Sequence, residues 1–171
     1  MDVQEVYDVI HKISEGFEEC VLKCLDNHSG NVVIAITEQL MCGIRSDDKY
    51  IDPNYDTDDY FDLEGPWHNN SQGYKAYKKE LTPPRASTLL DLPPRPDNIP
   101  NLKITGKFHS EINARRAGDM LLVDPGTGDG PAIVDKFTDK ILGLSSQGVA
   151  YFNTEYLRKA IEQHFQKCGY Q

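Results

Sequence analysis

The stretch from residue 101 to residue 124 constrains the fold most, and it reads NLKITGKFHSEINARRAGDMLLVD. Over residues 107–115, apolar or small side chains occupy every second position and polar side chains lie between them. A period of two is typical of a half-buried antiparallel strand, with one face on a core and the other in water. Ala117-Gly118-Asp119 predicts a turn, and residues 120–123 predict a second, more buried strand. We therefore expect a β-hairpin with the flanking helices packed on its apolar face, and His109 directed toward solvent or a partner.

Two helices are predicted before this hairpin. Apolar residues at three- and four-residue steps predict a long amphipathic helix over residues 3–25, which we expect to end near Gly30. Residues 31–43 combine a β-branched run, which favours a strand, with apolar residues at helical spacing. The polar Thr37-Glu38-Gln39 fits no buried strand, so we interpret this stretch as a second helix.

After the hairpin, residues 132–144 predict a short strand followed by a helical turn, with Phe137, Ile141 and Leu144 directed inward. A last amphipathic helix follows, capped by Asn153 or Thr154 and stopped by Gly169. The expected fold is α+β, with N-terminal helices and a C-terminal helix packed on a small antiparallel sheet.

Length and charge limit the organisation of the chain. At 171 residues it fits a single domain. We divide that domain into a helical part (1–44), an extended arm (45–100) and a hairpin with a C-terminal helix (101–171). A formal net charge of −9 argues against holding nucleic acid by electrostatic attraction, although not against lining a channel through which DNA passes.

Cysteine usage and hydropathy indicate where such a protein is made. The four cysteines lack the density of a secreted disulfide scaffold, so we interpret them as reduced core residues of a protein made in a cytosol. No signal-peptide pattern is present, and no apolar run approaches the ~20 residues that cross a membrane, so we expect a soluble protein without membrane partners.

Residues 45–100 differ in character from the rest of the chain. They hold eight of the ten prolines, and residues 47–64 carry eight acids against one lysine. Aromatic residues separated by polar ones suit a segment that lies along a surface and anchors there, whereas acids and prolines also favour disorder. We interpret the segment as a long irregular arm, interrupted by a short helix over residues 71–80, that contacts a neighbouring subunit. The candidate contact residues are Tyr50, Tyr55, Tyr60, Phe61, Trp67, Tyr74 and Tyr77.

Two stretches of the chain have spacings that resemble metal sites. Residues 52–58 place oxygens at the first positions of a calcium loop, but Thr57 stands where the sharp turn needs Gly, and Leu63 where a bidentate Glu is needed. Cys20, Cys24 and His28 are spaced four apart but lack a tight Cys-x-x-Cys pair, so core packing is the preferred interpretation. We predict no metal at either place.

No pattern predicts catalysis or a cofactor. The GTGDG loop at residues 126–130 lacks the Gly-Lys-Ser/Thr of a phosphate-binding loop, and no nucleophile signature is present. Lys75, Lys78 and Lys79 form a small basic patch, which we interpret as a solvated helix face. We therefore predict a protein that is not an enzyme and needs no cofactor.

Several short motifs follow one another along the chain: a Gln-Leu-x-x-Gly turn at residues 39–43, Trp67, Tyr77-Lys78, a Leu-x-x-Thr-Gly-x-Phe segment at residues 102–108 and an Ile-x-Gly-Leu segment at residues 141–144. The order of these motifs resembles a family of small bacteriophage virion proteins at the head–tail joint. These are neck, tail-completion or head–tail connector subunits, and the versions in Bacteroides and crAss-like phages are the most similar. The resemblance covers most of residues 33–165, and its specificity lies in the shared order of the motifs. Departures are Phe137-Thr138 in place of the usual Tyr-Gly, Arg45 where Asp is common, and a longer loop at residues 126–130.

The resemblance implies a structural virion protein, assembled in the host bacterial cytoplasm as an oligomeric ring subunit. Its implied partners are copies of itself, neighbouring neck proteins such as the portal or adjacent ring and tail proteins, and DNA passing through a lumen. The alternative is a soluble acidic binding module of phage or host, an inhibitor or adaptor whose acidic residues 47–64 mimic nucleic acid or bind a basic partner. A third interpretation is a small calcium-dependent enzyme or calcium-binding protein. Under the first reading, we expect deletion of residues 47–66 to leave the body folded and to block assembly.

Overall fold

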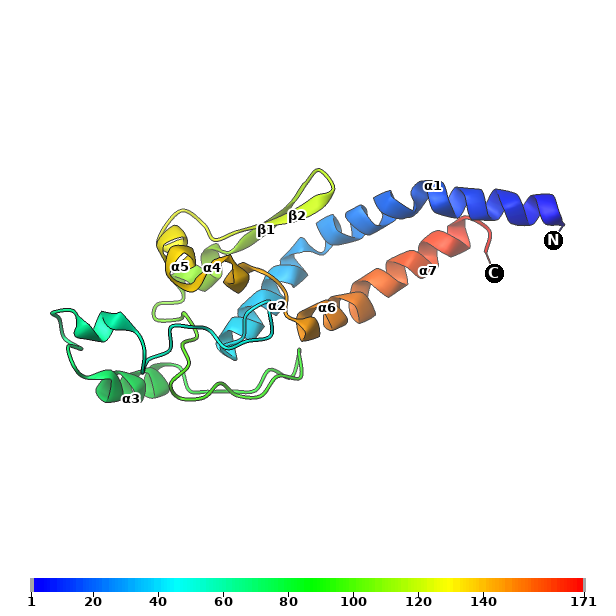
Figure 1. Ribbon diagram of the computed structural model, residues 1–171. Coiled ribbons are helices and arrows are strands. Elements are labelled where there is room, and N and C mark those ends of the chain that lie inside the picture. The colour runs from blue at the N-terminus through cyan, green and yellow to red at the C-terminus, as the bar shows by residue number, and fades with distance from the viewer. Residues whose placement is uncertain (1, 171) are drawn as a thin grey trace.

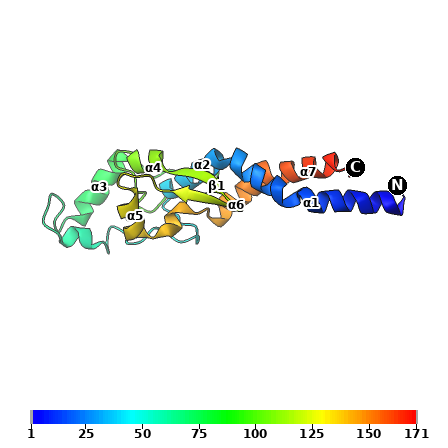
Figure 2. The same cartoon turned by 90° about the horizontal axis from the view of Figure 1, so that it is seen from above.

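The structure is a computed structural model that describes residues 2–170. The molecule is elongated, as Figures 1 and 2 show from two directions. At one end, helix α7 (Arg158–Lys167) runs back along the long helix α1 (Val3–Asn27), so that both ends of the chain lie there. At the opposite end lie helix α3 (Ser71–Leu81) and the loop that precedes it. The fold class is α+β, as predicted, with a two-stranded antiparallel sheet.

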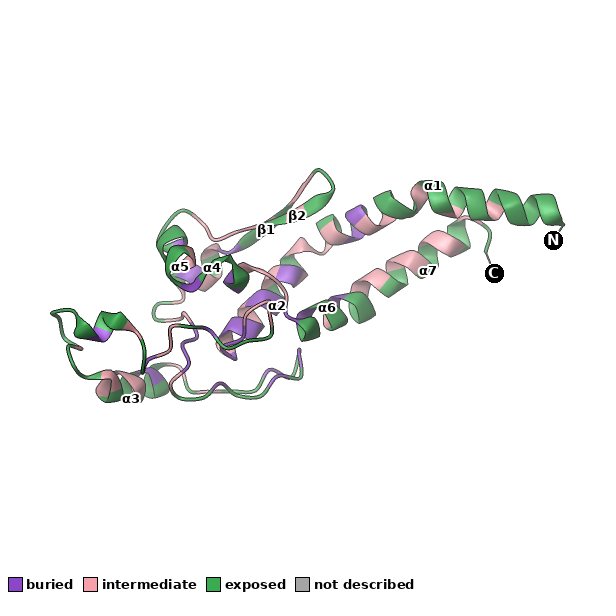
Figure 3. Cartoon of the chain, in the orientation of Figure 1, coloured by how far each residue is buried: buried purple, intermediate pink, exposed green. Residues whose placement is uncertain are grey.

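Helix α2 (Ser29–Met41) forms the centre of the core, as Figure 3 shows by its burial. The predicted second helix is therefore confirmed, but Gly30 lies inside it and does not end α1. α2 contributes Val32, Ile36 and Leu40 to the main core and Ala35 to a smaller cluster on its other side. The remaining buried residues of the main core are Cys24, Ile51, Ile99, Phe108, Ile112, Phe137, Ile141 and Phe152.

The predicted hairpin and its turn are confirmed, as strands β1 (Asn113–Ala117) and β2 (Met120–Asp124). Ala117 pairs with Met120 across the turn, in which Gly118 adopts φ +67°. The first strand starts later than predicted, because residues 107–111 form the short helix α4 (Lys107–Glu111). Phe108 and Ile112 are four residues apart, a spacing that lies on one face both of a strand and of a helical turn, so the helix can bury both side chains. The prediction that β2 is the more buried strand is wrong, because exposed and half-buried residues follow in the same order along both strands.

Every helix or strand that follows β2 in residues 125–170 is a helix, so the strand predicted at the start of residues 132–144 is wrong. Helix α5 (Gly130–Phe137) has Pro131 in its first turn, where a backbone N–H has no partner within the helix and its absence in proline therefore costs nothing. A 3-10 turn (Asp139–Leu142) follows. Phe137 and Ile141 are buried, as predicted.

Helix α6 (Ser146–Phe152) continues through a π-helical stretch (Asn153–Leu157) into α7. The predicted cap at Asn153 or Thr154 is therefore wrong: the Ser145 hydroxyl caps α6 by accepting the Gly148 N–H at 3.2 Å. Gly169, at φ +96°, follows the last helix as predicted.

The expectation of a long extended arm at residues 45–100 is not confirmed. Much of its backbone is irregular, but it folds against the rest of the chain and buries Ile51, Leu90 and Ile99. Helix α3 lies inside the segment as predicted, and a 3-10 turn (Asp59–Asp62) precedes it. Buried Arg95 secures the segment by donating to the backbone carbonyls of Ile99, at 2.9 Å, and Thr82, at 3.0 Å. Because Ile51 belongs to the main core, deletion of residues 47–66 would open that core, and the body is not expected to survive it.

Candidate interaction surfaces

Six of the seven candidate contact residues gather around α3. Tyr74 lies at the centre, with its ring centroid 5.1 Å from that of Tyr55, 5.4 Å from Phe61 and 5.3 Å from Trp67. These pairs meet edge to face, an arrangement that aromatic rings favour. Tyr77 stacks on Trp67 at 5.4 Å, and Tyr60 lies 5.3 Å from Phe61. Tyr50 stays outside this cluster and forms an isolated antiparallel bridge with Ile44.

The cluster forms one wall of a groove of about 710 Å³, here called the aromatic groove. The opposite wall comes from the segment before α4, from α4 itself and from α5, through Leu102, Ile104, Phe108, Ile133 and Phe137. Binding clefts in proteins measure roughly 300–1,000 Å³, so the aromatic groove has the size of a recognition site. Its floor is packed, since Tyr55 and Phe61 are each 6% exposed. Tyr60 and Tyr77 remain exposed at its mouth.

Lysines outnumber acids around the aromatic groove. Four lysines line it, against the two aspartates Asp58 and Asp129. Lys136 lies 2.7 Å from the Asp58 carboxylate and 5.8 Å from the centre of the Tyr60 ring, which places its charge over the aromatic wall. The groove is thus locally basic on a chain whose net charge is −9.

The predicted solvated lysine face is wrong for Lys78, which is 1% exposed. Its ammonium donates to the Asn101 side-chain oxygen at 3.1 Å and to the backbone carbonyl of Lys103. Burial lowers the pKa of Lys78 to about 8, and the neighbouring Arg95 charge acts in the same direction. His109 is also turned inward, against our expectation: its Nε2 lies 2.9 Å from the Asn101 carbonyl, and burial lowers its pKa to about 4.

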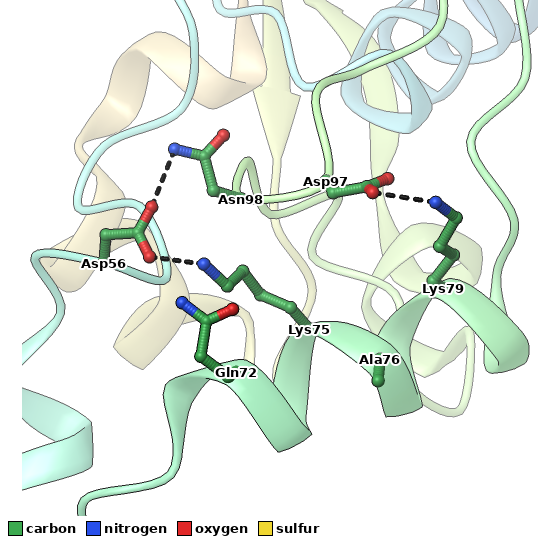
Figure 4. A pocket seen from close by; sticks show the side chains of 7 residues that line it. All are labelled: Asp56, Gln72, Lys75, Ala76, Lys79, Asp97 and Asn98. Carbon is green, nitrogen blue, oxygen red and sulfur yellow. Dashed lines mark hydrogen bonds and ion pairs between the residues drawn. The ribbon is translucent and has the colours of Figure 1, made fainter.

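The other two lysines of α3 border a polar cleft of about 530 Å³, shown in Figure 4. Lys75 lies 2.5 Å from the Asp56 carboxylate and Lys79 lies 2.8 Å from Asp97, while Asn98 donates to Asp56 at 3.1 Å. Each pair joins α3 to a loop elsewhere in the chain. This cleft therefore anchors the helix beneath the aromatic groove and presents no unpaired nucleophile or base among the residues drawn.

Half of the acids in residues 47–64 bind groups of the same chain. Asp47 lies 3.1 Å from Arg45 and 3.2 Å from Lys140, and Asp48 accepts the Ser146 N–H at 2.8 Å. Asp56 and Asp58 pair with the lysines described above, so the carboxylates of the calcium-like pattern diverge. Within residues 2–170, no cluster of three or more His, Cys, Asp or Glu side chains is arranged to hold a metal ion.

The cysteines of α1 are engaged in helix packing. Cys24 lies in the main core, where burial raises the pKa of its thiol, and the Cys20 thiol donates to the Ala160 carbonyl at 3.5 Å. His28, the third residue of the zinc-like pattern, stacks on Tyr156 with ring centroids 4.3 Å apart. All four cysteines are free thiols.

A second surface, which the sequence analysis missed, lies on α1. The helix packs on α7 through Val9, Ile13, Gly16 and Cys20, which are half-buried. A different face, here called the α1 stripe, leaves large apolar side chains in solvent. It consists of Val3 (88% exposed), Val6 (41%), Tyr7 (60%), Ile10 (60%) and Phe17 (40%).

The α1 stripe could have been recognised in the sequence. The apolar positions of residues 3–24 cover more of the helix circumference than one neighbouring helix can bury. Figures 1 and 2 show that the first turns of α1 extend beyond the end of α7. No helix among residues 2–170 is long and apolar enough to cross a membrane.

Comparison with known proteins adds nothing to this description: no protein-family model, no curated protein and no solved structure matches the chain. The aromatic groove and the α1 stripe both present apolar side chains that the chain itself leaves uncovered.

Proposed function

We propose that the protein is a non-enzymatic structural protein of a tailed bacteriophage, an oligomeric ring subunit at the head–tail interface. One observation carries the proposal: the molecule has two different apolar surfaces, the aromatic groove and the α1 stripe, at opposite ends of an elongated body. The order of motifs that resembles phage neck and connector proteins supplies the virion context.

Two unlike surfaces on one subunit favour head-to-tail association. Contacts between different surfaces repeat from subunit to subunit, and they close into a ring when the rotation between neighbours allows it. Contiguous exposed apolar patches on a monomer commonly mark such contacts, whereas exposed apolar residues that are scattered singly over a surface do not. The α1 stripe follows helical spacing along one face, and the aromatic groove is concave.

The charge of the chain suits a subunit that surrounds DNA without holding it. A net charge of −9 per subunit gives a ring a strongly negative field, which weakens binding to phosphates. Portal and adjacent ring or tail proteins are the proposed neighbours along the axis. The rival acidic binding module is less favoured, because Asp47, Asp48, Asp56 and Asp58 bind groups of this chain and are less available to a basic partner.

Size-exclusion chromatography with light scattering, followed by negative-stain imaging of any large species, tests the proposal. We expect closed rings whose population rises with protein concentration. A monomer at every concentration, also when mixed with purified portal protein, would contradict the ring proposal. Recovery of a basic host or phage protein that high salt removes would then favour the binding module.

A further inference from the structure

We propose that the aromatic groove of one copy receives the N-terminal end of α1, residues 2–10, from a second copy. This inference rests on the proposed ring function and names the contact that would build the ring. It follows from three properties of the two surfaces: the shape of the helix end, the composition of the groove and the distribution of charge.

The end of α1 is a preformed ligand. Asp2 and Glu5 form a reciprocal cap, in which the Asp2 carboxylate accepts the Glu5 N–H at 2.8 Å and the Glu5 carboxylate accepts the Asp2 N–H at 2.7 Å. This cap holds the first turns helical although α7 does not cover them. Little ordering entropy is then lost when the helix end enters a groove.

The apolar residues of this end have the spacing of a groove-binding helix. Val3, Tyr7 and Ile10 stand at positions i, i+4 and i+7, which is the pattern by which amphipathic helices anchor in apolar grooves. All three are at least 60% exposed. In the aromatic groove they would meet Tyr60, Trp67 and other uncovered ring faces.

The charges of the two surfaces are complementary. Residues 2–10 carry three carboxylates and no lysine or arginine. Of the four lysines that line the aromatic groove, Lys78 is buried and Lys136 pairs with Asp58, so Lys103 and Lys107 supply the positive charge that a second copy would meet. Complementary charge of this kind fixes the orientation of a contact and disfavours wrong partners.

The contact must form between copies. The groove is lined by residues of α3, α4 and α5, and in both views these helices lie far from the first turns of α1, so no chain can fill its own groove (Figures 1 and 2). The C-terminal segment reaches α1 at Val9, since a Cβ added to Gly169 would lie 3.5 Å from that side chain. Each docked pair leaves one groove and one helix end free for the next copy, which is the arrangement that a head-to-tail ring requires.

Two full-length variants separate the halves of this contact. Tyr7→Asp with Ile10→Asp disables the helix end and leaves the groove intact, whereas Tyr77→Asp disables the groove and leaves the helix end intact. All three side chains are partly exposed, so folding should tolerate the changes. Lys107→Glu is a second groove variant that reverses one charge of the lining and also removes the ion pair of Lys107 with Glu111 at 3.8 Å. Ile34→Asp, at a 50% exposed apolar residue outside both surfaces, is the matched control. Circular dichroism melts verify that each variant is folded.

Light scattering and sedimentation on each variant, alone and mixed one to one, give the answer. We expect each disabled variant to self-associate at least about tenfold more weakly than the wild type. We expect the control to behave as the wild type, and the mixture of helix and groove variants to form a dimer with one copy of each and nothing larger.

The possible results distinguish this contact from the ring itself. If Tyr77→Asp and Lys107→Glu form rings as the wild type does, the groove is not the receptor, although the ring function stands. If both disabled variants are monomeric and their mixture stays monomeric, the two surfaces do not pair. If the wild type forms no ring while the variants pair one to one, the contact is correct and the ring function is wrong.

Discussion

At the scale of single residues, Lys78 links the stability of the protein to pH. Its pKa of about 8 in the folded chain lies below the value of 10.5 in an unfolded chain, so the unfolded chain binds more protons between these pH values. Stability therefore rises with pH across that window. We expect the free energy of unfolding of the wild type to gain about 2 kcal/mol over that of Lys78→Met between about pH 7.5 and about pH 9.5.

Urea unfolding of both proteins at several pH values measures this difference. The window from about pH 7.5 to about pH 9.5 lies below the range in which buried tyrosines change the free energy of unfolding. Burial raises the pKa of Tyr74 to about 12, so this tyrosine affects stability only as the pH approaches and passes its usual pKa of 10.0. Curves that stay parallel for the wild type and Lys78→Met would show that Lys78 keeps its proton on folding. That result would contradict the burial assigned to it.

Single residues also show where sequence reasoning stopped. Phe108 and Ile112 fit both a period of two and a helical turn, so the pattern could not decide between strand and helix, and Gly106 at φ +86° starts the helix. The burial of Lys78 depends on Asn101, which lies 23 residues away in the chain, and no local pattern reports such a pairing. By contrast, six of the seven aromatic candidates do gather around α3, because their density in an acidic segment is a local property, while their contact with another subunit stays a prediction.

At the scale of elements, alanine substitutions at two helical glycines distinguish the effect of packing on stability from the effect of helix propensity. Gly30 lies in α2 with open space where the Cβ of another residue would stand, whereas a Cβ on Gly16 of α1 would lie 2.6 Å from the His164 ring. That ring is held in place, with its Nε2 3.0 Å from the Ile13 carbonyl. Alanine favours a helix over glycine by up to about 1 kcal/mol, and overpacking costs about 1–3 kcal/mol.

We therefore expect Gly30→Ala to raise the free energy of unfolding by up to about 1 kcal/mol and Gly16→Ala to lower it by about 1 kcal/mol. Chemical denaturation measures both values. Adding His164→Ala to Gly16→Ala and comparing with His164→Ala alone provides the control, since the cost should disappear once the ring is removed. Equal stabilisation by both alanines would mean that α7 does not press on α1 at Gly16.

The elements that were predicted correctly are those with a strong period of their own. The helices at residues 3–27, 29–41 and 71–81 each carry apolar side chains at helical steps or a clear cap. Outside α3, residues 45–100 carry no such period, and their attachment to the body depends on Arg95 bonding to backbone carbonyls and on Ile51 entering the core. Such contacts join residues that are distant in the sequence, and composition does not report them. Composition alone therefore predicted an extended arm, whereas the segment folds back onto the body.

At the scale of the whole molecule, the salt dependence of association distinguishes a ring subunit from an acidic binding module. Subunits that each carry a charge of −9 repel one another, and at about 1 M salt the screening length falls to about 3 Å, which removes this long-range repulsion. Salt also weakens the attraction between the acidic helix end and the groove lysines. The apolar contact of the α1 stripe with the aromatic groove is not screened, because it depends on area removed from water.

We therefore expect the assembled species to persist, or to become more abundant, as salt rises from about 0.1 M to about 1 M, whereas a complex of an acidic module with a basic partner dissociates steeply over the same range. Sedimentation of the wild type at several salt concentrations provides the measurement. Lys107→Glu serves as the comparison, since its assembly should recover part of the lost affinity when salt screens the reversed charge. Assembly of the wild type that disappears at high salt would assign the contact to charge alone, and the apolar docking of α1 would then have no part in it.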